Sequence, residues 1–152
     1  MEIIEISKAL LTPLIAIVAV YIAYQQYKLS KFNTKRELYD KNLSVYKAIM
    51  DYLGAILVSG NVSSLDTANL LRNTSESYFL FKKDVADYID ELYKKGNKLH
   101  MYKIMIDRYR NDNSKNEEYE SFCQKDEELF EWFTKQFDET KKLFKKYLAL
   151  HK

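Results

Sequence analysis

The sequence predicts an all-α protein in which an apolar N-terminal transmembrane helix continues into an antiparallel bundle of about four helices. Three observations lead to this fold class. The 152 residues include only three glycines and one proline, which are too few for the turns of an all-β domain. Residues 9–27 carry no formal charge. From residue 39 onward, apolar residues recur three or four positions apart, as on one face of an amphipathic helix.

The uncharged stretch at residues 9–27 has the length and the flanks of a membrane-spanning helix. At 1.5 Å per residue its nineteen residues reach about 28 Å, close to the roughly 30 Å hydrocarbon core of a bilayer. We therefore expect a transmembrane anchor over residues 1–28 and a cytoplasmic helical bundle over residues 29–152. The span residues that we single out are Pro13, Ala16, Ala19, Ala23 and Tyr24, and the basic residues expected to face lipid headgroups are Lys28, Lys31, Lys35 and Arg36.

Two other structures are compatible with so apolar a stretch. A cleaved signal peptide begins with basic residues and ends at small ones, whereas Glu2 and Glu5 precede this stretch and no such cleavage site follows it. A buried helix of a soluble protein, here serving dimerisation, normally keeps a polar face, and residues 9–24 offer only Thr12. One basic residue before the stretch and four after it predict an external N-terminus and a cytoplasmic remainder.

Two features inside the stretch predict finer structure. Thr12 and Pro13 suit the N-cap and the first turn of a helix, so we expect the regular helix to begin at Pro13. A kink at Pro13 that serves gating is the alternative. Ala16, Ala19 and Ala23 fall on one face, where small residues would let two such helices approach closely.

One long helix is expected to leave the apolar stretch and enter the bundle directly. No helix breaker separates Pro13 from Gly54, and Gly60-Asn61 is the first clear stop. Apolar residues along this segment form two adjacent ridges, which together make a wide apolar face. The ridges are Tyr39, Leu43, Tyr46, Met50, Leu53 and Leu57 on one side and Val45, Ile49, Tyr52 and Ile56 on the other.

A short helix is expected next, followed by an apolar turn. Ser63-Ser64-Leu65-Asp66 has the form of a capping box, which opens a helix. Residues 78–81, Tyr-Phe-Leu-Phe, are expected to form a turn packed into the core. In the short helix the residues expected to face inward are Leu65, Ala68, Leu70 and Leu71.

Two further long helices complete the predicted bundle. The first starts near Lys83, and Gly96 on its apolar stripe indicates a close helix crossing or a weak point. Residues 111–114 are the clearest loop, and Ser114–Glu117 is a second capping-box candidate. The last helix concentrates acids at residues 117–131 and lysines at residues 139–152, as the helix dipole favours. Its lysines, with those at 28–36, either meet anionic lipid or serve solubility.

Residues suited to metal, cofactor or nucleophilic chemistry are sparse. The only histidines, His100 and His151, are far apart in the sequence, and Cys123 is the single cysteine, so no usual zinc-ligand set is present. Carboxylates one turn apart, such as Glu127 and Glu131, lack the Glu-x-x-His element of di-iron bundles. Phosphate-binding loops need glycines that the chain lacks. We therefore expect no enzyme activity, no cofactor, no small-molecule substrate and no nucleic-acid partner.

A series of short elements runs through residues 9–99 behind the apolar segment and its basic flank. They are Asp40-Lys41, Val45-Tyr46-Lys47-Ala48, Gly60-Asn61-Val62-Ser63, Leu71-Arg72-Asn73-Thr74, Phe79-Leu80-Phe81, Asp84 and Tyr88-Ile89-Asp90-Glu91-Leu92-Tyr93. This layout resembles small bacterial single-pass membrane-anchored proteins of unknown function. The resemblance implies a bacterial inner-membrane location and a cytoplasmic helical domain, and it implies nothing catalytic.

Together these features predict a non-catalytic adaptor or scaffold that holds a protein partner, or further copies of itself, at the bacterial inner membrane. Arg72, Phe79 and Phe81 are the candidate partner-binding residues, with core packing as the competing role for the two phenylalanines. The alternative function is an oligomeric membrane-active effector, such as a toxin or phage-defence component, that acts through its transmembrane helix.

Overall fold

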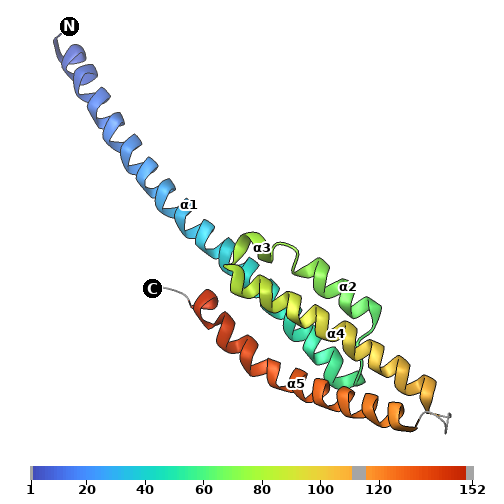
Figure 1. The fold of residues 1–152 in the computed structure, drawn as a ribbon. Helices are drawn as coiled ribbons and strands as arrows, with labels where there is room; N and C mark the ends of the chain where they lie inside the picture. The colour runs from blue at the N-terminus through green and yellow to red at the C-terminus, as the bar shows by residue number, and fades with distance from the viewer. Residues whose placement is uncertain (1, 111–115, 150–152) are drawn as a thin grey trace. The chain divides into compact units, whose positions relative to one another are not determined.

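Helices joined by short turns make up the part of the chain that the computed structural model of the protein describes (Figure 1). That part comprises the backbone of residues 2–110 and 116–149, with side chains from residue 13 onward. Its helices are α1 (Glu2–Ser59), α2 (Ser64–Asn73), α3 (Ser77–Leu80), α4 (Lys83–Tyr109) and α5 (Asn116–Leu148). No strand occurs within these ranges, so the predicted all-α class is confirmed. The predicted loop at 111–114 and the capping residue Ser114 lie outside the described residues.

Residue contacts divide the chain into two compact units, Met1–Leu38 and Tyr39–Lys152. We call them the first unit and the second unit. The first unit is formed by α1 alone, and the second contains the remainder of α1 with α2 to α5. Within the described residues, no helix combines the length and the hydropathy that a membrane crossing requires.

Helix α1 begins earlier than expected and ends where expected. It starts at Glu2 and contains Pro13 in its interior, so the predicted start at Pro13 is wrong. A proline inside a helix removes one backbone hydrogen bond, and the good helix formers before Pro13 allow the helix to continue on both sides of it. The predicted stop is confirmed: Gly60 adopts a φ of 66°, and its N–H donates to the Ile56 carbonyl at 2.8 Å.

The core of the second unit lies between α1, α4 and α5, and the predicted apolar stripes supply it. All four residues of the second ridge of α1 are buried, as are Phe133 and Phe144 of α5 at 0% exposure. Burial of such stripes is the main source of stability in a helical bundle. The core residues are Val45, Ile49, Tyr52, Leu53 and Ile56 of α1, Val62 and Leu70 beside and in α2, Phe81, Val85, Ile89, Leu92 and Leu99 around α4, and Leu129, Phe133 and Phe144 of α5.

Helix α2 has the predicted capping box but not the predicted inner face. The Asp66 N–H donates to Ser63 Oγ at 3.0 Å, and the Ser63 N–H donates to Asp66 Oδ2 at 3.1 Å. Of the four residues expected to face inward, only Leu70 is buried; Leu65, Ala68 and Leu71 are exposed. A ten-residue helix lying on the bundle covers one narrow stripe, here Leu70 with Thr74, whose Oγ1 donates to the Leu70 carbonyl at 2.7 Å.

The apolar segment around α3 is divided between the core and the surface. Phe81 is buried and Leu80 packs partly against the core, but Tyr78 is 75% and Phe79 is 85% exposed. The expectation that the whole segment plugs the core is therefore wrong. Successive side chains of a single helical turn point about 100° apart, so one side of α3 cannot bury all of them.

Helices α1 and α4 cross closely at Gly96, as its place on the apolar stripe predicted. A Cβ at this position would overlap the hydroxyl of Tyr52 and lie 3.6 Å from Val62 Cγ2. Tyr52 is only 3% exposed, and its hydroxyl has no hydrogen-bond partner among the described residues. Burial raises the pKa of Tyr52 to about 12.

Replacing Gly96 with alanine is expected to lower the free energy of unfolding by about 1–3 kcal/mol, because Tyr52 must shift in a packed core. Tyr52→Phe alone is expected to cost little, since it removes an unpartnered hydroxyl. In a double-mutant cycle followed by urea unfolding, Tyr52→Phe should recover part of the Gly96→Ala loss. Strictly additive effects would contradict the close crossing.

Candidate functional site

The described apolar side chains of the first unit are exposed on every side of α1. We call Leu14, Ile15, Ile17, Val18, Val20 and Ile22 the apolar sleeve; their exposures lie between 48% and 69%. Successive residues turn by about 100°, so the apolar sleeve covers a little over half of the circumference, and the exposed Ala16, Ala19 and Ala23 occupy the remaining side of the helix. The predicted span residues Pro13, Ala16, Ala19, Ala23 and Tyr24 are exposed as well.

Aromatic and basic residues follow the apolar sleeve along α1. Tyr21, Tyr24 and Tyr27 are 62–65% exposed, and Gln25 Nε2 donates to Tyr21 Oη at 3.0 Å. The predicted lipid-facing residues Lys28, Lys31, Lys35 and Arg36 are all exposed. Along the helix, exposed apolar residues are therefore followed by exposed tyrosines and then by exposed basic residues.

The three predicted partner-binding residues lie in different environments. Arg72 is exposed, and its Nη2 donates to Asn69 Oδ1 at 2.9 Å. Phe79 is exposed, but Phe81 is a core residue whose ring lies 5.3 Å from that of Phe144 and 4.9 Å from that of Tyr147, centre to centre. The prediction that Phe81 faces a partner is wrong, because these edge-on ring contacts bury it.

Three segments that are distant in sequence, in α1, at the start of α3 and in α5, meet at one end of the second unit. Asn42 Nδ2 of α1 donates to the Tyr147 carbonyl of α5 at 3.2 Å. Lys41 Nζ lies 3.7 Å from a Glu76 carboxylate oxygen just before α3. The Tyr46 and Phe144 rings lie 5.5 Å apart. We call this part of the second unit the α3 end.

Asp84, in the first turn of α4, holds the C-terminal part of α5 at the α3 end. Lys146 Nζ donates to Asp84 Oδ2 at 2.5 Å, and Tyr147 Oη donates to Asp84 Oδ1 at 2.8 Å. The hydrogen bond from Lys146 holds the pKa of Asp84 below its ordinary value, and burial together with Asp84 raises the pKa of Tyr147. The negative charge near the N-terminus of α4 is also favoured by the helix dipole.

Replacing Asp84 with asparagine is expected to lower the free energy of unfolding by about 1 kcal/mol at neutral pH, a modest loss because Lys146 remains in contact with solvent. The folded-state pKa of Asp84 lies below its ordinary value of 3.8. Its contribution is therefore full above that pH and is lost as the pH falls through the folded-state pKa.

Urea unfolding at neutral pH and below about pH 3 measures this effect, because the gap between wild type and Asp84→Asn should shrink in acid. Asp87→Asn, at an exposed carboxylate on the same helix, is the matched control and should stay within about 0.5 kcal/mol of wild type. A gap that persists unchanged in acid would contradict the role of the Asp84 charge.

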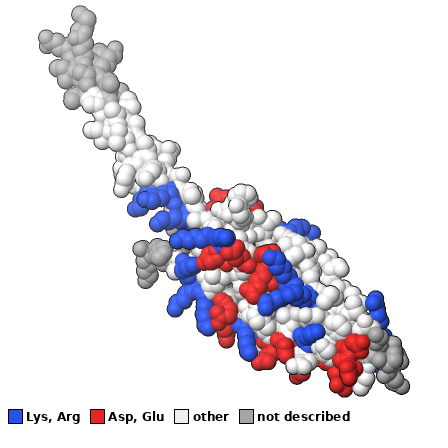
Figure 2. Space-filling model, viewed as in Figure 1, with Lys and Arg blue, Asp and Glu red and all other residues white. Residues whose placement is uncertain are grey.

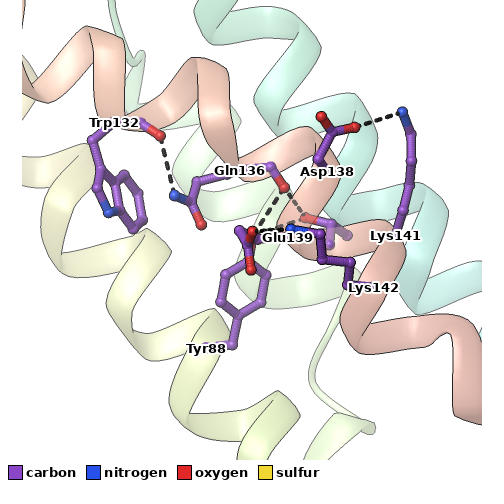
Figure 3. A network of polar contacts seen from close by, with 8 residues as sticks. Tyr88, Trp132, Gln136, Asp138, Glu139, Lys141 and Lys142 are labelled. Atoms are coloured by element: carbon purple, nitrogen blue, oxygen red, sulfur yellow. Dashed lines mark hydrogen bonds and ion pairs between the residues drawn. The ribbon is translucent and has the colours of Figure 1, made fainter.

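A polar layer joins the second turn of α4 to the C-terminal half of α5 (Figure 3). Tyr88 Oη lies 2.8 Å from Thr140 Oγ1, and Thr140 Oγ1 donates to the Gln136 carbonyl at 2.7 Å. Gln136 Nε2 donates in turn to the Trp132 carbonyl at 3.1 Å. Burial raises the pKa of Tyr88 to about 12, so its hydroxyl is a neutral hydrogen-bonding group at physiological pH. This satisfied network fixes the pairing of the two helices.

A second polar contact joins α4 and α5 nearer the other end of the bundle. Lys103 Nζ lies 2.5 Å from Oδ2 of Asp126, which is only 8% exposed. Nδ1 of His100 is buried without a hydrogen-bond partner among the described residues. No group of three or more potential metal-ligating side chains occurs within the described ranges, and Cys123 is a half-buried free thiol.

Sequence reasoning missed the Asp84 contact, because Asp84 and Lys146 are 62 positions apart. The only local signal is an acidic residue in the first turn of a predicted helix.

No family model matches the chain, and no curated protein or solved structure shows significant similarity to it.

Proposed function

We propose that this chain is a non-catalytic adaptor, anchored in the bacterial inner membrane by the N-terminal part of α1, that presents its second unit to a protein partner in the cytoplasm. The observation that carries the proposal is the exposure of apolar side chains on all sides of α1, where the apolar sleeve and the alanines Ala16, Ala19 and Ala23 together leave no polar face. Soluble monomers rarely expose contiguous apolar surface on this scale, so another medium must cover it.

Lipid accounts for the geometry of the apolar sleeve better than a second copy of the chain does. A helix pair covers one stripe of each helix and leaves the opposite side in water. Lipid covers the full circumference, and each fully buried aliphatic side chain contributes about 1.5–3 kcal/mol. The uncharged stretch starts at residue 9, before the first described side chain, so its span length is taken from the sequence.

The flanking residues support the same assignment. Exposed tyrosines at the end of the apolar sleeve have the amphipathic character that favours the membrane interface. The basic residues Lys28, Lys31, Lys35 and Arg36 follow, against a single lysine, Lys8, before the stretch. This asymmetry favours an external N-terminus and a cytoplasmic second unit.

The exposed face of α2 supports the adaptor role. Leu65 is 69% and Leu71 is 46% exposed, and Ala68 and Arg72 are exposed on the same short helix. Leucines presented beside an arginine have the composition of a protein-binding surface, in which apolar anchors and arginine supply most of the affinity. We assign partner binding to this face of α2.

Photocrosslinking in intact cells tests the adaptor role. A benzophenone amino acid at Leu65 or Leu71 of the full chain is expected to form a protein adduct, either with a second protein or with another copy of the chain. The same probe at Asn97, an exposed position on α4, is the matched control and should form none. Lipid adducts alone at both α2 positions, or equal protein adducts at Asn97, would contradict the assignment.

A further inference from the structure

We propose that the α3 end of the second unit binds the headgroups of anionic lipids and so forms a membrane contact separate from the anchor. This inference rests on the proposed membrane location. Its components are the exposed aromatic pair Tyr78 and Phe79 together with five exposed lysines from the helix segments that meet at this end, Lys41, Lys82, Lys83, Lys145 and Lys146.

Tyr78 and Phe79 project from the bundle instead of completing its core. They are 75% and 85% exposed, and their rings contact each other edge-on with centres 5.4 Å apart. The next aromatic residue, Phe81, turns inward and holds α3 against α5 through Phe144 and Tyr147. The core thus fixes one side of this segment and leaves an aromatic pair on the other, a chemistry favoured at the membrane interface.

The lysines gather at the α3 end because of the way the helices pair. Asp84 holds Lys146 beside the start of α4, which brings the last turn of α5 next to Lys82 and Lys83. Lys41 reaches Glu76 at the start of the α3 segment. Of the five lysines at this end, Lys41 and Lys146 contact the carboxylates of Glu76 and Asp84.

The opposite end of α5 carries the opposite charge. Its first turns contain Glu117, Glu118 and Glu120, all exposed. In Figure 2 blue side chains predominate over the C-terminal half of α5, with some red ones among them, and red side chains gather toward its start. A negatively charged surface would therefore attract one end of the second unit and repel the other.

Chain connectivity favours a bilayer as that surface. The segment at residues 28–38 is helical, so at most about 16 Å of chain separates the interfacial Lys28 from the second unit. Nucleic acid would be attracted by the lysines as well, but the aromatic pair adds an apolar element that lipid headgroups and upper acyl chains accommodate. Each lysine near an anionic bilayer strengthens binding about fivefold.

An environment-sensitive fluorophore tests the proposal on the full chain reconstituted in nanodiscs. The label is placed by Phe79→Cys in a Cys123→Ser background, and zwitterionic discs are compared with discs containing phosphatidylglycerol. We expect a blue shift in the anionic discs, and reversal by high salt. The matched control is a label at Val58→Cys, a 91% exposed position in the last turn of α1, whose fluorescence should show no blue shift.

Lysine substitutions supply the second arm. Lys82→Gln with Lys83→Gln should reduce the equilibrium constant for the membrane contact about 25-fold, whereas Lys94→Gln with Lys98→Gln, the same charge change elsewhere on α4, should leave it unchanged. A Val18→Cys label reports the anchor separately. If Val18 is lipid-exposed and Phe79 shows no shift, or shifts equally in both discs, the α3-end proposal is overturned; if Val18 is in water, the proposed anchor itself fails.

Discussion

Replacing Phe144 with alanine is expected to lower the free energy of unfolding of the second unit by about 3–5 kcal/mol, the usual cost of removing a large side chain from a packed core. Phe144 is 0% exposed. Its ring contacts those of Tyr46, Phe81 and Tyr147, with centres 5.5, 5.3 and 6.4 Å away. One side chain therefore joins α1, the segment after α3, and α5, so its loss leaves a cavity that no single helix movement can close.

The loss is measurable by denaturant unfolding in a mild detergent, followed through the fluorescence of Trp132. This is the single tryptophan, and its ring lies 5.0 Å from that of Phe133, centre to centre, in the core. Phe79→Ala removes the same side chain from an exposed position and should change stability by no more than about 0.5 kcal/mol. Similar losses for the two variants would contradict the assignment of Phe144 to the core and of Phe79 to the surface.

Replacing Ile17 with arginine is expected to shift the chain from the membrane fraction toward the soluble or aggregated fraction. Ile17 belongs to the apolar sleeve and is 68% exposed. An arginine near the centre of a membrane-spanning helix costs about 2.5–3.5 kcal/mol of insertion free energy, and the loss of isoleucine adds about 0.5 kcal/mol. The insertion equilibrium should therefore fall by two orders of magnitude or more.

Fractionation of cells that express each variant at equal levels measures this shift. Val58→Arg introduces the same charge at a 91% exposed position of the second unit and is the matched control, which should remain with the membranes. If both variants fractionate as wild type does, the apolar sleeve does not carry the insertion energy, and the anchor assignment is wrong.

Local features of the fold could be predicted because their causes are local. The capping box at Ser63 and Asp66 forms as two reciprocal hydrogen bonds between residues three apart. Gly60 ends α1 because glycine adopts a positive φ without strain. The apolar stripes of α1, α4 and α5 recur at the helical period over many turns, so the sequence alone identifies their buried faces.

Predictions failed where the environment of a side chain depends on a neighbour far away in the sequence. Leu65 and Leu71 are as apolar as Leu70, but only Leu70 lies over the bundle. Phe79 is 85% exposed and Phe81 only 9%, although they are two residues apart. Rings of α5 cover Phe81, whereas nothing in the described chain covers Phe79. Hydropathy shows that a residue can be buried; packing decides whether it is.

The features of the candidate site also differ in whether local sequence or distant packing determines them. The apolar sleeve and the basic residues after it are exposed because the first unit has no second helix to pack against them. The order of these residues along α1 can be read from the sequence. The Asp84 contact with Lys146 and Tyr147 requires α4 and α5 to be antiparallel and in one register, which no local pattern specifies. The lysines of the α3 end come from segments far apart in the sequence, and only the pairing of α4 with α5 brings them together.

Alkaline carbonate extraction of bacterial membranes that contain the full-length chain tests most directly whether lipid surrounds the apolar sleeve. Our account predicts that the wild-type protein remains in the membrane pellet at high pH and enters solution only with detergent. Recovery of the protein in the carbonate supernatant, or its purification as a stable oligomer without any amphiphile, would show that protein covers these side chains and would contradict the account.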